Sequence, residues 1–176
     1  MKNIILITLI AVFSTISANA QATKMSSVYT NLQTDCKAES KVEADEVPFI
    51  CKEVGGFRVR IIPAGAWAET VEIVDKQGET VVSFGNVGYG YSTTNNRKVE
   101  WRMANGKPFA VIFRVNTYNA EKANEDGDSP FLAKYKTGEK LLIRGLSGYT
   151  QIEFEVDGKD KNANLNAQKK ADENFQ

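Results

Sequence analysis

The 176-residue chain contains no histidine and only two cysteines, and its 22 basic side chains are balanced by 22 acidic ones. The absence of histidine excludes Ser-His-Asp and Cys-His catalytic sites, histidine-based metal sites, and the side chain that most often transfers protons near neutral pH. Nucleic-acid-binding proteins usually carry a basic excess that releases counterions, so the zero net charge argues against a nucleic-acid partner. The hydrophobic content of 42% fits one globular core.

The first 20 residues have the features of an export signal. Met1-Lys2 is a short basic start, Ile4–Phe13 is almost entirely apolar, and Ala18-Asn19-Ala20 has the form that signal peptidase cleaves. The apolar run is shorter than the roughly 20 residues that span a bilayer, and no later segment is apolar for long enough. We therefore predict a signal peptide at 1–20, a flexible mature N-terminus at 21–27, no membrane span, and a periplasmic or secreted location.

Cys36 and Cys51 are the only cysteines, and both lie beyond the predicted cleavage site. An even pair in an exported chain most simply forms a disulfide. It would close a charged loop of 14 residues and contribute about 3 kcal/mol to stability. A nucleophilic cysteine is the alternative, but no histidine is present to activate it. We predict a structural bridge.

From Phe57 to Val156 the pattern is mainly an alternation of apolar and polar residues, which is typical of half-buried strands. The expected strands are 57–61, 71–73, 80–84, 99–103, 109–115, 131–136, 141–144 and 152–156. Asn105-Gly106 predicts a hairpin turn, and Thr137-Gly138 predicts a second one.

The last segment, Asn164–Phe175, has no glycine or proline and predicts a polar helix. Its apolar residues Leu165 and Ala167 are spaced too thinly to bury much surface. No internal repeat or linker divides the chain. The sequence thus predicts a mainly β fold over residues 28–176, a single antiparallel sandwich or small barrel closed by a C-terminal α-helix.

Several short motifs carry a resemblance to a known family. They are Cys36, Cys51, Gly55-Gly56-Phe57, Trp67–Val71, Val99–Arg102, Ala110–Arg114, and Asn162-Ala163-Asn164 with the helix that follows. Through them the chain, from about Val28 to Asp172, resembles a family of exported bacterial proteins of uncharacterised activity. It departs at Gly65-Ala66-Trp67-Ala68, where a Gly-Asp-Leu-Arg turn is expected. The resemblance implies export and a β-domain, and it carries over no catalytic residue.

Carboxylates are the remaining acid–base candidates. Glu153, Glu155 and Asp157 share one face of an expected strand, but each alternates with an apolar neighbour and is expected to point to solvent. Residues 124–129 place oxygens around a glycine as a calcium loop does, but Tyr135 occupies the twelfth position, where such a loop needs glutamate. A partial calcium site and a solvated acidic turn are both compatible with this segment.

Arginines, unlike most lysines, fall within the expected strands. These arginines are Arg58, Arg60, Arg102, Arg114 and Arg144. If their strands are neighbours, Arg58 and Arg102 would belong to an anion-binding strip, because guanidinium groups bind carboxylates and phosphates in fixed geometry. The alternative is cross-strand pairing with the equally abundant acids Glu72, Glu100, Glu153 and Glu155.

The glycine-, asparagine- and serine-rich segment 85–96 contains Tyr89 and Tyr91. Tyrosine offers large contact area at low entropic cost, and small neighbours let a loop adapt to a partner. The alternative is that these rings fold back and cap one end of a barrel. We take Trp67, Tyr89 and Tyr91, together with Arg58 and Arg102, as the candidate binding residues.

These features favour an exported, non-enzymatic binding or interaction module, of which an inhibitor is one form. Its partner would be an unknown protein or glycan of the cell envelope. No cofactor or metal is expected, and no catalytic residue is assigned. One alternative is a hydrolase of envelope polysaccharide, which needs two buried carboxyl groups about 5–10 Å apart in one cleft. Another is a small-ligand carrier, which needs a deep apolar pocket.

Overall fold

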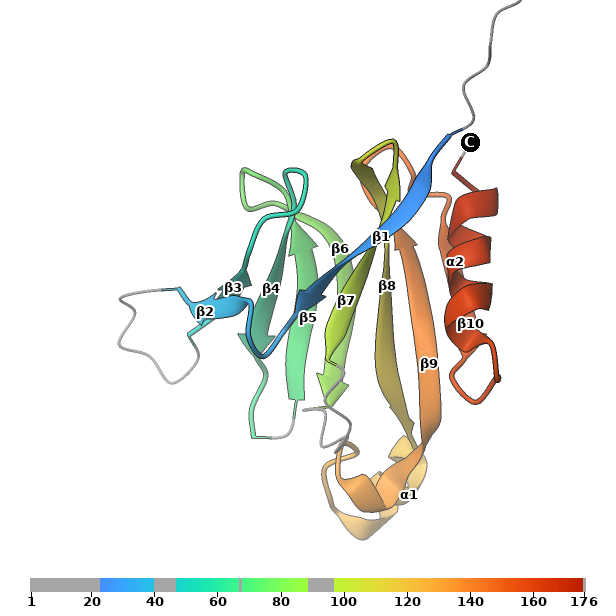
Figure 1. Cartoon of the computed structure of the whole chain (residues 1–176). Helices are drawn as coiled ribbons and strands as arrows, with labels where there is room; N and C mark the ends of the chain where they lie inside the picture. The colour runs from blue at the N-terminus through green and yellow to red at the C-terminus, as the bar shows by residue number, and fades with distance from the viewer. Residues whose placement is uncertain (1–22, 40–46, 67, 89–96, 176) are drawn as a thin grey trace, which may run out of the picture.

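The computed structural model describes residues 23–39, 47–66, 68–88 and 97–175 (Figure 1). Its strands are β1 (Met25–Asn31), β2 (Cys36–Ala38), β3 (Phe49–Cys51), β4 (Arg58–Pro63), β5 (Ala68–Val74), β6 (Thr80–Gly88), β7 (Lys98–Ala104), β8 (Lys107–Tyr118), β9 (Lys136–Gly145) and β10 (Glu153–Asp157). The helices are α1 (Ala120–Asp126), the 3₁₀ turn η1 (Ala133–Tyr135) and α2 (Ala163–Glu173). Within the described residues, none of them is long and apolar enough to cross a bilayer.

The strands form two five-stranded sheets in which every neighbouring pair is antiparallel. The first sheet has the order β1-β7-β8-β9-β10, and the second has the order β2-β3-β4-β5-β6. The two sheets face each other, and α2 lies against the opposite face of the first sheet (Figure 1). The predicted antiparallel sandwich with a C-terminal helix is confirmed.

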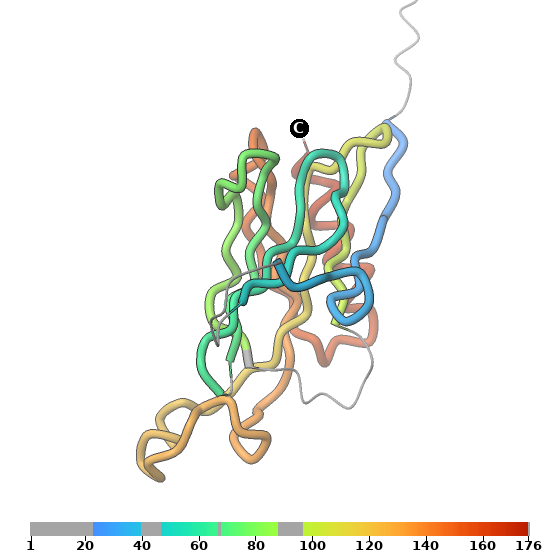
Figure 2. The backbone as a smooth tube through the Cα atoms, turned by 90° about the vertical axis from the view of Figure 1, so that its left-hand side faces the viewer, coloured from blue at the N-terminus to red at the C-terminus, as the bar shows by residue number. Residues whose placement is uncertain are grey.

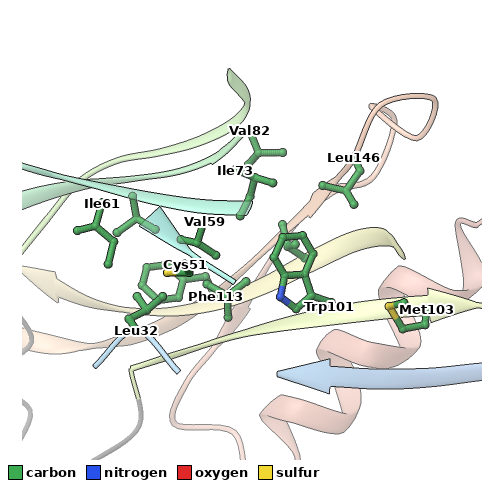
Figure 3. Packing of buried hydrophobic residues seen from close by; sticks show 13 residues of the cluster. Leu32, Cys51, Val59, Ile61, Ile73, Val82, Trp101, Met103, Phe113 and Leu146 are labelled. Atoms are coloured by element: carbon green, nitrogen blue, oxygen red, sulfur yellow. The ribbon is translucent and has the colours of Figure 1, made fainter. Parts of the chain in front are cut away.

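The main core fills the space between the sheets. Val59 and Ile73 come from the second sheet, and Trp101 and Phe113 come from the first (Figure 3). Trp101 is fully buried, and its indole N–H donates to the buried hydroxyl of Thr30 at 2.8 Å. The polar atom of the largest core side chain is therefore satisfied, as buried polar groups require.

A second core lies between α2 and the first sheet. The helix presents Ala163, Ala167 and Ala171, one turn apart on one face and all buried, to a sheet surface that includes Ile112 and Ile143. The expectation that this helix buries little was wrong. Small alanine side chains let the helix approach the first sheet closely. A helix face that looks weakly apolar in the sequence therefore still forms a close-packed interface.

The Cys36–Cys51 disulfide is present, and the two cysteines are direct partners in the β2–β3 ladder. Cys51 is buried in the main core. The bridge therefore joins a short edge strand to the body of the sandwich, which confirms the predicted pairing.

The structure differs from several expectations about the strands. The expected strand 131–136 is wrong: residues 133–135 form the turn η1, where the Tyr135 hydroxyl is bonded to Asp126 and Asp128, and β9 begins only at Lys136. The predicted flexible N-terminus at 21–27 is wrong for residues 25–27, because they belong to β1 and pair with the end of β7. Thr137-Gly138 lies inside the continuous strand β9, where Gly138 pairs with Thr117, so the second expected hairpin is wrong. The first is correct: Asn105 and Gly106 have φ values of 50° and 80°, as a tight β7–β8 turn requires.

Candidate interaction site

The aromatic candidates Trp67, Tyr89 and Tyr91 lie outside the described residues. Their described neighbours Ala68 and Gly88 are direct partners in the β5–β6 ladder. The described ends of both segments are therefore adjacent, at the end of the sandwich where β8 also runs into α1 (Figure 1).

A buried ion pair holds this end together. Glu69, 3% exposed, lies on the core-facing side of β5, and its carboxylate contacts the guanidinium of Arg97 just before β7. Burial lowers the pKa of Arg97 from its ordinary value. Separating the two charges would leave each of them buried without a partner, which costs free energy. The pair therefore holds the start of β7 against the second sheet.

The arginine candidates do not meet. Arg58 lies in the second sheet, whereas Arg102 lies in the first sheet beneath α2. Both terminal arms of the Arg102 guanidinium are engaged within the fold. Its Nε and Nη2 donate to the two carboxylate oxygens of Asp172 at 3.0 and 2.6 Å, and its Nη1 donates to Ser27. The Nε atom of Arg58 is buried and has no hydrogen-bond partner among the described residues.

Arg102 belongs to a polar network that crosses three elements. The Ser27 hydroxyl of β1 donates to Glu100 of β7, and the amide of Gln168 from α2 donates to the same Glu100 oxygen at 2.7 Å. Glu100 and Arg102 are both nearly inaccessible. Such a network satisfies its buried charges and fixes how α2 docks on the sheet, which is a structural role.

The other strand arginines follow the cross-strand alternative. Arg60 and Glu72 are direct partners on β4 and β5, joined at 2.6 Å. Arg144 and Glu153 are direct partners on β9 and β10, 3.7 Å apart. Arg114 pairs with Glu139 at 3.1 Å. These arginines and acids neutralise each other across neighbouring strands, as expected for a half-solvated sheet.

The most conspicuous feature at this end was missed by sequence reasoning. Between Tyr118 and Lys136, 17 residues leave the sandwich and return as a projecting arm, which we define as Asn119–Tyr135 (Figures 1 and 2). The backbone N–H of Asn119 donates to the C=O of Tyr135 at 2.9 Å, closing the base of the arm. One available signal was Asn119 three residues before Lys122, because an asparagine side chain that accepts the Lys122 N–H is a helix N-cap.

The interior of the arm is organised around Tyr135, which is buried. Its hydroxyl lies 2.8 Å from a carboxylate oxygen of Asp126 and 2.7 Å from one of Asp128. The arm's two lysines neutralise these acids: Lys122 contacts Asp126 at 2.8 Å, and Lys134 contacts Asp128 at 2.5 Å. The four charges and the phenol thus fix the return path of the chain.

These contacts shift the ionisation of the arm. The hydrogen bonds from Lys122 and Tyr135 lower the pKa of Asp126, and those from Lys134 and Tyr135 lower the pKa of Asp128. Desolvation, opposed in part by Lys134, raises the pKa of Tyr135 to about 12. Both aspartates are therefore ionised at neutral pH, and the tyrosine keeps its proton.

Residues 124–129, the possible calcium loop, do not form an open loop, because the first three of them are the end of α1. Asn124 and Glu125 lie within α1, and the oxygens of Asp126 and Asp128 are engaged by Tyr135 and the lysines. No group of three or more histidine, cysteine or acidic side chains among the described residues is arranged to hold a metal ion.

Two grooves of about 390 and 380 Å³ flank β10 and are lined mainly by polar and charged residues. They share Glu155 and Asp157, and Glu155 is half-exposed and paired with Lys140 at 2.7 Å. Among the described residues the two buried glutamates are Glu69 and Glu100, which lie on different sheets, each with its own arginine. The arrangement of carboxylates required for the hydrolase alternative is therefore not formed by these acids.

Comparison of this chain with protein-family models, with curated proteins and with solved structures found no match.

Proposed function

We propose that this chain is an exported, non-enzymatic binding module that engages a protein or glycan of the cell envelope through the end of the sandwich that carries the Asn119–Tyr135 arm. One observation carries the proposal: the arm is long, projects from the body, and is held by its own side chains rather than by the core of the sandwich.

The fold itself does not need the arm. β8 and β9 are antiparallel neighbours, and such strands are commonly joined by 2–5 residues. A connection of 17 residues adds surface and costs conformational entropy. Long, ordered connections of this kind are usually functional.

The arm is also preorganised for binding. Tyr118 and Phe131 pack edge to face at 5.5 Å, Asn119 caps α1, and Gly127 ends it with φ of 71°. Because these contacts already order the arm, the arm loses little further conformational entropy when a partner binds. This supports recognition by a rigid surface rather than by a segment that folds on contact.

The charge of the arm indicates the complementary surface. It carries four carboxylates and two lysines, and the lysines are already committed to Asp126 and Asp128. Glu121 and Glu125 remain exposed to solvent. A partner surface with basic groups is therefore favoured, and association should weaken as salt rises.

Export is part of the proposal. The Cys36–Cys51 disulfide fits a location outside the reducing cytoplasm, and the signal-like residues 1–20 lie outside the described part of the chain. The predicted binding residues Trp67, Tyr89 and Tyr91 lie outside the described residues, but their described neighbours Ala68 and Gly88 lie at the same end of the sandwich as the arm, so the proposal includes these aromatic residues.

The test replaces the arm with an Asn-Gly turn between Tyr118 and Lys136 and compares this variant with the mature, oxidised protein. Each is immobilised and exposed to a solubilised envelope fraction and to purified envelope glycans at micromolar concentration. We expect the parent to retain a ligand that the arm-less variant does not. The control is Leu165→Ser, on the exposed face of α2, which should retain the same ligand.

Unchanged cooperative unfolding of the arm-less variant would show that the loss of binding is local. Retention of the same ligand without the arm would refute the role of this surface. Recovery of nothing by the parent protein would refute the interaction function itself.

A further inference from the structure

β1 is an edge strand of the first sheet with none of the usual protection against pairing. Its seven residues, Met-Ser-Ser-Val-Tyr-Thr-Asn, include no charged residue and no proline, and its register with β7 is unbroken. Figure 2 shows it along one margin of the molecule, with no described segment beyond it. Natural edge strands usually carry charges, bulges or prolines that prevent such pairing.

The other edges are protected in these ways. β10 carries Glu153, Glu155 and Asp157, and β2 has only three residues. β6 has two register irregularities against β5, and its Gly85 has φ of 67°. Among the edge strands that the structure describes, only β1 is long, regular and uncharged.

The hydrogen bonds at both ends of β1 show which backbone groups are free. The C=O of Lys24 accepts from Asn105, and the N–H of Leu32 donates to Arg97. In an antiparallel ladder, alternate residues bond to the same neighbour, so the even-numbered residues of β1 face β7. The N–H and C=O groups of Met25, Ser27 and Tyr29 therefore point away from the sheet, and the described part of the chain supplies no partner for them.

Two of the three exposed residues of β1, Val28 and Tyr29, have large apolar side chains. Val28 and Tyr29 are 41% and 53% exposed, and only Phe49 and Leu165 are other large hydrophobic residues of the described chain with comparable exposure. Val28 pairs with Trp101 and faces the second sheet, whereas Tyr29 pairs with Glu100 on the α2 side. The free backbone edge is thus flanked by apolar surface on both faces.

We propose that β1 pairs antiparallel with β1 of a second copy of this chain, about a two-fold axis through Ser27. Met25 would then face Tyr29 of the other copy, Ser27 would face Ser27, and each such pair would exchange two backbone hydrogen bonds. The first sheets of the two copies would join into one continuous sheet.

The arrangement of the unpaired backbone groups of Met25, Ser27 and Tyr29 favours a second copy of this chain as the partner of β1. They are placed symmetrically about Ser27, so the edge is complementary to itself, as a two-fold interface requires. No like charges on β1 oppose each other in this register, and the Met25 sulfur would meet the exposed Tyr29 ring. A single strand pair is smaller than the roughly 1,200–2,000 Å² of stable interfaces, so the dimer would be weak and concentration-dependent.

The first test is sedimentation equilibrium of the mature, oxidised protein from about 5 μM to 500 μM. We expect the average mass to rise toward twice the monomer mass. Tyr29→Lys should weaken the association at least about tenfold, because an edge lysine opposes pairing. The monomer should tolerate this lysine, since Glu100 lies directly opposite. Leu165→Lys, a matched apolar-to-lysine change on α2, should leave association unchanged.

A second test fixes the register. In the proposed pairing Ser26 faces Val28 of the other copy at a non-hydrogen-bonded position, where Cα atoms lie about 4.5 Å apart and a disulfide can form. Under mild oxidation, a mixture of Ser26→Cys and Val28→Cys proteins should crosslink, whereas each variant alone should not.

A parent protein that stays monomeric at 500 μM would overturn the proposal. So would an association that Tyr29→Lys does not weaken, or crosslinking of the single variants as efficient as that of the mixture. Because these readouts do not involve the arm, their failure is distinguishable from failure of the proposed binding function.

Discussion

Replacing Asp172 by alanine should destabilise the protein by about 2–4 kcal/mol. Asp172 supplies both acceptors for the forked contact with Arg102, whose side chain is only 7% exposed. Breaking a buried ion pair from one side typically costs about 3–5 kcal/mol, because it leaves a charge without compensation. Two features reduce the cost here: Asp172 is 27% exposed, and Glu100 remains 3.7 Å from Arg102.

Urea-induced unfolding of the oxidised protein, followed by circular dichroism, measures this loss directly. At roughly 2–4 °C per kcal/mol for a domain of this size, the melting temperature should fall by roughly 4–16 °C. Glu173→Ala is the matched control, because the adjacent acid forms only an exposed pair with Lys169 and should cost under about 0.5 kcal/mol. The effect of Asp172→Ala should also persist at high salt, since dissolved ions screen a largely buried ion pair much less than an exposed one.

The double variant Arg102→Met/Asp172→Leu completes the test. Replacing both partners by apolar side chains should recover most of the lost stability, because no uncompensated charge remains. A cost for Asp172→Ala as small as that of Glu173→Ala would refute the assignment of Arg102 to a structural pair. It would return Arg102 to the set of candidate binding residues.

Three further outcomes are expected. The double variant Cys36→Ala/Cys51→Ala, which cannot form the disulfide, should have an unfolding free energy about 3 kcal/mol lower than the oxidised parent, measured by unfolding in urea. Tyr135→Phe should raise the carboxyl pKa values of Asp126 and Asp128 by removing the phenol donor, as followed by NMR titration; unchanged values would contradict the contacts described. In the parent both pKa values are lowered, so their contribution to stability is present above about pH 4 and lost as the pH falls below it. Ala167→Leu should cost about 1–3 kcal/mol, because the added volume has no space against the first sheet.

The sequence alone determined the features that depend on local chemistry. Alternation of apolar and polar residues predicted the strands containing Val71 and Trp101, since a half-buried strand must present one apolar face, and a continuous apolar run predicted the strand containing Phe113. Asn105-Gly106 predicted a tight turn because both residues accept positive φ. The two cysteines had only each other as partners.

Only the tertiary structure decided what depends on residues distant in sequence. Arg102 looked available for a ligand until Asp172, 70 residues away, proved to occupy it. The buried face of α2 emerged only from its packing, because alanine contributes little to a hydropathy pattern yet fits closely against a sheet. The arm depends on Tyr135 meeting two aspartates across a turn of the chain, and the free edge of β1 depends on which strands pair. Local periodicity encodes which face of an element is apolar, whereas the choice of partner is made by the packing of the whole chain.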